Sequence, residues 1–269
     1  MSSLRLTRRA RRALAHTTAG AAGAAALLAT PPAGAAPVTP SIAIKFGTDQ
    51  PGRPGDTNGA VTGPAGVLNT GVWNNFGGQN SASPQALLAD VAGASSPTAA
   101  TVSWTSNNTW SSTGLGEENN TATGENGDLM AGYLDTGGLG GTPVTITVAN
   151  LPVVSPRFDV YVYTQGGVNT RGGTYTINGT TKEHTGMTAF GGTFVEDTID
   201  PGQQQDSNYL VFRGLTGTGF VLTGVPTIGN PARAPINAIE IVAVPEPAGV
   251  ALLGVAAIGL LRRRRHRPA

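Results

Sequence analysis

Short segments of alternating apolar and polar residues recur between positions 41 and 242, and they constrain the fold more than any other feature. Residues 145–148 (TITV) and 158–163 (FDVYVY) are the clearest, and Gly, Pro and Asn clusters separate such segments. Successive side chains of a strand point to opposite faces, so a period of two over four to eight residues is typical of a half-buried strand. No stretch sustains a period of 3.6, so the sequence predicts an all-β domain built as an antiparallel β-sandwich.

One turn can be predicted from its chemistry. Asn178 and Gly179 separate residues 174–177 from residues 180–182. Both residue types accept the positive φ that a two-residue hairpin turn requires, so we expect a β-hairpin here. Residues 85–92 (QALLADVA) are ambiguous on pattern alone, because they fit either two helical turns or a strand.

Composition excludes several classes of function. The chain has no cysteine, which removes disulfides, thiolate metal sites and a cysteine nucleophile. Five arginines lie in the first twelve residues and five in the last eight, and residues 37–244 hold the other seven basic residues against fifteen acidic ones, a net charge of −8. Nucleic-acid binding depends on Lys and Arg neutralising phosphates, so we expect no nucleic-acid partner.

The N-terminal segment has three parts. Residues 1–12 are basic, residues 13–28 are Ala-rich and apolar, and the small residues Ala33, Gly34 and Ala35 follow. This order is typical of a secretory signal peptide with an A-x-A cleavage site. We therefore expect residues 1–36 to form a signal helix that is cleaved after Ala35 or Ala36, and residues 37–243 to be exported as one ectodomain.

The C-terminal segment, residues 244–269, also has three parts. Pro245, Glu246 and Pro247 precede an apolar run at residues 248–261. Four arginines close it: Arg262, Arg263, Arg264 and Arg265. Fourteen residues make a helix of about 21 Å, against a hydrocarbon core of about 30 Å, which predicts a short transmembrane helix that is a marginal anchor. The arginines place the C-terminus in the cytoplasm by the positive-inside rule.

This segment resembles the PEP-CTERM sorting signal of Gram-negative bacteria that make exopolysaccharide. The resemblance rests on V-P-E-P-A at residues 244–248, the short apolar run and the closing arginines. It implies that an exosortase-type membrane enzyme recognises Pro245, Glu246 and Pro247. It further implies a precursor tethered in the inner membrane, followed by transfer to the cell surface or extracellular matrix.

The body resembles the β-rich ectodomains that accompany this signal. The similar stretches are IAIKFG, GVWNNF, LMAGYLD, VTITVANLP, FDVYVY, YTING and INAIEIV. The resemblance implies a jelly-roll-like antiparallel β-sandwich and favours a strand at residues 85–92. Domains of this style often bind carbohydrate, which is an analogy at the level of the fold.

Catalytic signals are weak. His184 is the only histidine in residues 37–244, and no G-x-S-x-G motif accompanies it, so we interpret it as an exposed polar strand residue. The adjacent acids Glu196 and Asp197 would point to opposite faces of a strand. We expect a structural or adhesive protein of exopolysaccharide or biofilm rather than an enzyme, with a secreted hydrolase as the weakest alternative.

Two candidate binding features remain. Asp56, Glu125 and Asp128 lie in Gly-rich stretches that resemble flexible acidic calcium loops, although no EF-hand run occurs, so Ca²⁺ is the single cofactor considered. Trp110 lies in polar sequence and is expected to be the most exposed tryptophan, where its indole could stack against a sugar. These features favour a carbohydrate-binding module, with or without calcium, as the alternative function.

Overall fold

The computed structural model describes residues 40–50, 59–112, 120–138, 140–152, 157–166, 168, 171–186, 189–199, 202 and 207–244. The predicted signal peptide, the sorting segment from Pro245 onward and Asp56 lie outside these residues. Within them, no helix is both long and apolar enough to cross a membrane. The predicted terminal helices are therefore not confirmed.

The described residues form thirteen strands and one short helix. The first strands are β1 (Ser41–Phe46), β2 (Trp73–Phe76), β3 (Gln85–Val91), β4 (Ala94–Thr105) and β5 (Asn108–Ser111). The helix is α1 (Glu125–Ala131). After it come β6 (Gly132–Asp135), β7 (Val144–Ala149), β8 (Arg157–Tyr163), β9 (Gly172–Ile177), β10 (Thr180–Thr185), β11 (Tyr209–Leu215), β12 (Phe220–Ile228) and β13 (Ala238–Val244). The all-β class is thus confirmed.

Eleven strands belong to one sheet with the order β10-β9-β12-β7-β4-β3-β1-β13-β8-β11, and β2 pairs with β1 beside this path. Every pairing in it is antiparallel except that of β1 with β2. The sheet curls until it is nearly a barrel, and a bridge between Gly186 and Ser207 links the segments next to its two edge strands. A jelly-roll sandwich has two sheets, so this finer topology is not confirmed.

The main core lies inside the curled sheet. Strands from all parts of the path contribute to it, for example Ile44 of β1, Ile146 of β7, Phe212 of β11 and Leu222 of β12. Each is at most 2% exposed. A closed sheet produces a single core cluster with residues from all its strands, because the inward side chains of these strands face one another.

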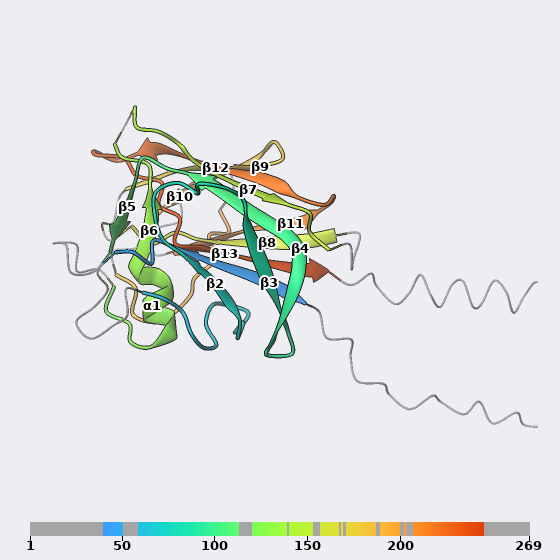
Figure 1. The fold of residues 1–269 in the computed structure, drawn as a ribbon. Coiled ribbons are helices and arrows are strands. Elements are labelled where there is room, and N and C mark those ends of the chain that lie inside the picture. The colour runs from blue at the N-terminus through green and yellow to red at the C-terminus, as the bar shows by residue number, and fades with distance from the viewer. Residues whose placement is uncertain are drawn as a thin grey trace, which may run out of the picture. The chain divides into compact units, whose positions relative to one another are not determined.

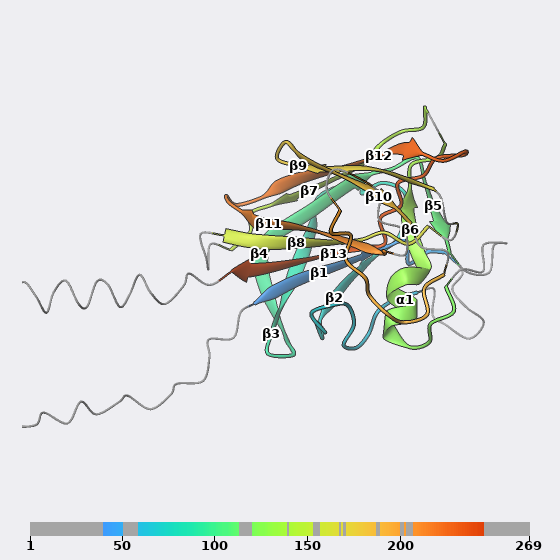
Figure 2. The same ribbon diagram turned by 180° about the vertical axis from the view of Figure 1, so that it is seen from behind.

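A second core covers the outer face of β1, β13, β8 and β11. Ala43, Tyr163 and Ala238 of the sheet contribute to it, together with residues from α1 and from the segments around Val61 and Phe190. Figures 1 and 2 show α1 beside the sheet, next to β6. The central strands are therefore buried on both faces, and β1 is accordingly buried from Ile42 to Phe46.

The predicted hairpin is confirmed. Ile177 pairs with Thr180, and Asn178 and Gly179 have φ values of 48° and 82°. The ambiguous residues 85–92 form β3 rather than a helix. Its pairing with β4 continues the sheet, a long-range contact that a local pattern does not contain.

The two ends of the sheet differ in what they carry. Ser41 pairs with Val242, so β1 begins and β13 ends at the same end, which we call the terminal end. Ile236, just before β13, bonds with Leu134 of β6 at the opposite end, and β5 and β6 form a separate two-stranded ribbon there. We call this the ribbon end; the two lie apart in both views (Figures 1 and 2).

Candidate functional site

A polar pocket of about 290 Å³ lies at the ribbon end. We call it the Trp110 pocket; it is lined by Asn107, Asn108, Trp110, Tyr133, Asp135, Gly137, Arg171 and Arg233. Its lining combines one aromatic side chain that is partly exposed with amides, a carboxylate and two guanidinium groups. Such a mixture of stacking surface and hydrogen-bonding groups suits a polar ring-shaped ligand.

The β5–β6 ribbon places the tryptophan. Trp110 pairs with Tyr133 and Asn108 with Asp135 across the two strands. Ser106 fixes the entry to β5, because its hydroxyl oxygen lies 2.9 Å from the carbonyl of Gln79 and 2.8 Å from that of Asn108, and its one proton bonds to either. Trp73 and Trp104 are 8% and 5% exposed, whereas Trp110 is the most exposed of the three, as the sequence predicted.

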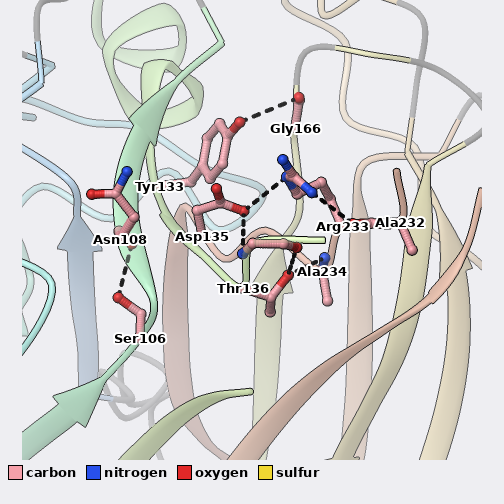
Figure 3. A network of polar contacts seen from close by, with 10 residues as sticks. Ser106, Asn108, Tyr133, Asp135, Thr136, Gly166, Ala232, Arg233 and Ala234 are labelled. Atoms are coloured by element: carbon pink, nitrogen blue, oxygen red, sulfur yellow. Dashed lines mark hydrogen bonds and ion pairs between the residues drawn. The ribbon is translucent and has the colours of Figure 1, made fainter. Parts of the chain in front are cut away.

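Asp135 and Arg233 form an ion pair at one wall of the pocket. Arg233 Nε lies 3.3 Å from Asp135 Oδ1, and the same oxygen accepts the backbone N–H of Gly137 at 3.1 Å. Thr136 continues the network, because its Oγ1 accepts the N–H of Ala234 at 3.1 Å. Figure 3 shows Asp135 and Arg233 pointing toward each other across this network. Both charged groups are thereby held in fixed positions.

The start of β6 is held by two buried side chains. Lys45 Nζ donates to the carbonyl of Gly132, and Asn237 Nδ2 donates to the same carbonyl at 3.1 Å. We call this arrangement the Gly132 clamp. Gly132 also approaches the backbone of Gly47 so closely that an added Cβ would lie 2.1 Å from the Gly47 carbonyl oxygen. Any larger residue would push β6, and with it Tyr133 and Asp135, away from the sheet.

Asn237 extends this clamp to a third segment. Its Nδ2 also donates to the carbonyls of Met130 and Gln165, and its Oδ1 accepts the N–H of Gln165. One buried amide thus joins α1, β6 and the segment after β8. The sequence offered no reason to single it out, because an Asn in the stretch INAIEIV reads as an ordinary turn residue.

Two buried ionisable groups lie on the outer face of β1 and β13. Burial lowers the pKa of Lys45 to about 7, although the carboxylates of Asp128 and Asp49 oppose the shift. Burial raises the pKa of Glu240 to about 7, and Tyr163 donates a hydrogen bond to its Oε2. Both groups therefore change charge near neutral pH, without facing the pocket.

The predicted calcium residues are only partly described. Glu125 begins α1, and its carboxylate accepts hydrogen bonds from the N–H and hydroxyl of Thr62 at 2.6 and 2.9 Å. Asp128 lies one turn further along α1 rather than in the expected loop, and Asp56 lies outside the described residues. Among described residues, no group of three or more acidic or histidine side chains could hold a metal ion. The calcium site stays a prediction.

His184 is not the exposed strand residue that the sequence suggested. It is 1% exposed, and its Nδ1 lies 3.1 Å from Asp197 Oδ2 and 3.2 Å from Ser207 Oγ. Asp197 is likewise buried rather than solvated. In a Ser-His-Asp triad the serine and the acid bind opposite ring nitrogens, so that one nitrogen takes the serine proton while the carboxylate accepts the N–H of the other. Here both contact the same nitrogen, which favours a structural role.

A second, apolar hollow of about 40 Å³ lies at the terminal end. We call it the terminal groove; it is lined by Pro40, Ile42, Ala89, Leu151, Pro152, Arg157, Phe158, Gly217, Ile241 and Ala243. Arg157 pairs with Val244, the last described residue. The groove therefore adjoins the point where the chain leaves the sheet toward the Pro-Glu-Pro tripeptide. Pro245, Glu246, Pro247 and the four arginines Arg262 to Arg265 lie outside the described residues.

The pocket residues Asp135, Arg171 and Arg233 were missed by the sequence analysis. Arg171 and Arg233 could have been considered, because only seven basic residues occur in residues 37–244 and a rare residue type is a candidate for a specific role. What the sequence lacked was proximity, since Trp110 and Arg233 are separated by more than a hundred positions.

Comparison with known proteins identifies one part of the chain. Residues 243–265 match the family model described as the PEP-CTERM protein-sorting motif. No curated protein and no solved structure matches the chain. The match contains Pro245, Glu246 and Pro247, the apolar run and the arginines. The chain thus carries a PEP-CTERM sorting motif, which indicates an exported, exosortase-sorted protein, directly after a β-rich domain.

Proposed function

We propose that this protein is a non-enzymatic structural or adhesive component of an extracellular polysaccharide matrix, delivered to the cell surface through its sorting motif. The motif match at residues 243–265 supports the route. The position of β13 supports it as well, because this strand ends at Val244, directly before the tripeptide. The last strand of the folded domain thus ends at the residue before Pro245, Glu246 and Pro247, the positions that a processing enzyme would recognise.

The adhesive part of the proposal assigns glycan binding to the Trp110 pocket. The observation that carries it is the partly exposed indole of Trp110 in a pocket with fixed amide, carboxylate and guanidinium groups. The C–H face of a sugar packs on an indole, and hydrogen-bonding groups around it select its orientation. The motif thus supports the proposed route of the protein, and the pocket supports the proposed binding of glycans.

The route is tested by the double variant Pro245→Ala with Glu246→Ala. We expect the precursor to remain full-length in the inner membrane, because the recognition positions are lost. Immunoblots of fractionated cells and the mass of the mature protein measure this. Pro84→Ala, an exposed proline of the domain, is the matched control. If the double variant is released like the wild type, the sorting role of the tripeptide is wrong.

Glycan binding is tested with the full-length protein in detergent on a glycan array. We expect Trp110→Ala to lose binding by at least about tenfold, since stacking supplies an aromatic contact worth on the order of 1 kcal/mol beyond the area it buries. Trp110→Phe should keep part of it. A parallel array with a chelator tests the calcium prediction. Binding that is equal in wild type and Trp110→Ala would remove the adhesive role of this pocket.

A further inference from the structure

The body has seven basic residues, and three of them lie away from the Trp110 pocket in contacts or a groove already described. Lys45 is fully buried with its Nζ on two backbone carbonyls. Arg213 contacts both carboxylate oxygens of Glu196 at 2.9 Å. Arg157 lies at the terminal groove. Against this background, the lining of a single pocket by both Arg171 and Arg233 is a concentration of positive charge in an acidic domain.

The charge of the pocket is not cancelled by its own carboxylate. Among the described residues that line the pocket, Asp135 is the single acid beside the guanidinium groups of Arg171 and Arg233, so these side chains together carry a net positive charge. Asp135 contacts Arg233 through Nε, and one terminal nitrogen of Arg233 donates to the carbonyl of Ala232 at 3.0 Å. A guanidinium has five N–H donors in a rigid fork, so donors remain for a ligand carboxylate.

Trp110 is far from Arg171 and Arg233 in the sequence, but all three residues line the same pocket. A sugar ring that stacks on Trp110 would place its substituents toward Asp135, Arg171 and Arg233, which line the same space. Arg233 is also partly shielded, with 22% of its side chain exposed, so a bound anion would be screened less by solvent and salt than on an open surface.

From this arrangement we infer that the ligand of the Trp110 pocket is an acidic polysaccharide, bound through a uronate-type sugar whose carboxylate meets Arg171 and Arg233 while its ring stacks on Trp110. The inference rests on the proposed glycan binding and narrows it to one class. The net charge of −8 over residues 37–244 repels a polyanion elsewhere on the body. Binding of an acidic polymer must therefore be local to this pocket, which makes it sensitive to single substitutions.

The test compares two polymers that differ in charge alone, polygalacturonate and its fully methyl-esterified form, with the full-length protein in detergent. For the acidic polymer we expect Arg171→Gln and Arg233→Gln each to weaken binding at least about fivefold, the size of a partly shielded ionic contact. Arg213→Gln, which changes an arginine outside the pocket, should bind like the wild type. Thermal unfolding of each variant establishes that it is folded, and Arg171→Gln keeps the test open if loss of the Asp135 partner unfolds Arg233→Gln.

The outcomes separate the two levels of the proposal. Preference for polygalacturonate that disappears in the Arg171 variant supports the acidic class. Equal binding of both polymers that Trp110→Ala abolishes would keep glycan binding and overturn the acidic class. Binding of neither polymer, or binding that Trp110→Ala leaves unchanged, would overturn both. Loss of binding in Arg213→Gln would also overturn the local site, because it would point to general charge attraction.

Discussion

The Trp110 pocket at the ribbon end and the terminal groove at the other end of the sheet differ in the chemistry of their linings. At the ribbon end a pocket of about 290 Å³ is lined by charged and amide groups, and buried polar side chains hold its walls. At the terminal end the groove beside Val244, of about 40 Å³, is lined mainly by apolar residues such as Leu151 and Phe158, and a separate hollow of about 510 Å³ has Ser41 and Asp90 in its lining. We propose that the two ends have different tasks, with ligand recognition at the Trp110 pocket and sorting beside the terminal groove.

β13 connects the two ends. From Ile236, bonded to Leu134 of the ribbon, to Val244 is eight residues, about 26 Å along an extended strand. From Val244 to the apolar run at 248 is four residue steps, at most about 14 Å. On the proposed route, an apolar run inserted in the membrane would therefore hold the terminal groove near the lipid surface. The Trp110 pocket lies at the far end of the same strand.

The largest effect is expected at the Gly132 clamp. Asn237→Ala should lower the free energy of unfolding by about 4 kcal/mol, because several buried hydrogen-bonding groups of the backbone lose their partner. Urea denaturation measures this. Ile241→Ala at the terminal end should destabilise by a comparable amount of about 3 kcal/mol through lost packing. Only the Asn237 variant should also lose glycan binding. An equal loss of glycan binding in the Asn237 and Ile241 variants would contradict the distinction between the ends.

Glu240 should make stability fall as pH rises. Its pKa is raised from 4.5 to about 7 in the folded protein, so between these values the folded state holds a proton that the unfolded state has released. The resulting loss is about 3 kcal/mol from pH 4.5 to 7. In Glu240→Gln this part of the dependence should vanish in urea denaturation at several pH values. An unchanged slope would mean that burial does not control this carboxyl.

Lys45 should act in the opposite direction above neutral pH. Its pKa is lowered from 10.5 to about 7, so between these values the unfolded state binds a proton that the folded state lacks, and stability rises with pH. From pH 7 to 9.5 the gain is about 3 kcal/mol relative to Lys45→Met, which has no such group. The comparison is made by urea denaturation at both pH values. Parallel curves for the two proteins would contradict the assignment.

The smallest expected effect is on the rate of precursor processing, which should respond to a substitution at the terminal end and not to one at the ribbon end. Arg157→Glu, beside Val244, should slow processing of the precursor about two- to threefold, because it places negative charge at an anionic membrane surface. Trp110→Ala should process normally. Pulse labelling of the precursor measures the rate, and glycan binding should show the reverse pattern. Slower processing in the Trp110 variant would show that the ends are coupled.

Some features could be predicted because they depend on neighbours in the chain. Asn178 and Gly179 specify their turn by accepting positive φ, and the hairpin forms as expected. Helix α1 could not be predicted in this way, since Gly124 provides no side-chain cap and Gly127 lies inside the helix. Burial of Leu129 and Met130 in the second core accounts for it. Local propensity is a weak guide where packing decides.

The functional residues divide in the same way. The sequence by itself determined the all-β class, the tripeptide before a short apolar run and the likeness to a sorting motif, because these are patterns of adjacent residues. Only the tertiary structure decided that the sheet is one curled path, that His184 is buried, and that Trp110 shares a pocket with Asp135 and Arg233. Those facts depend on which distant strands pair, and pairing is settled by the combined burial of the whole sheet rather than by any one segment.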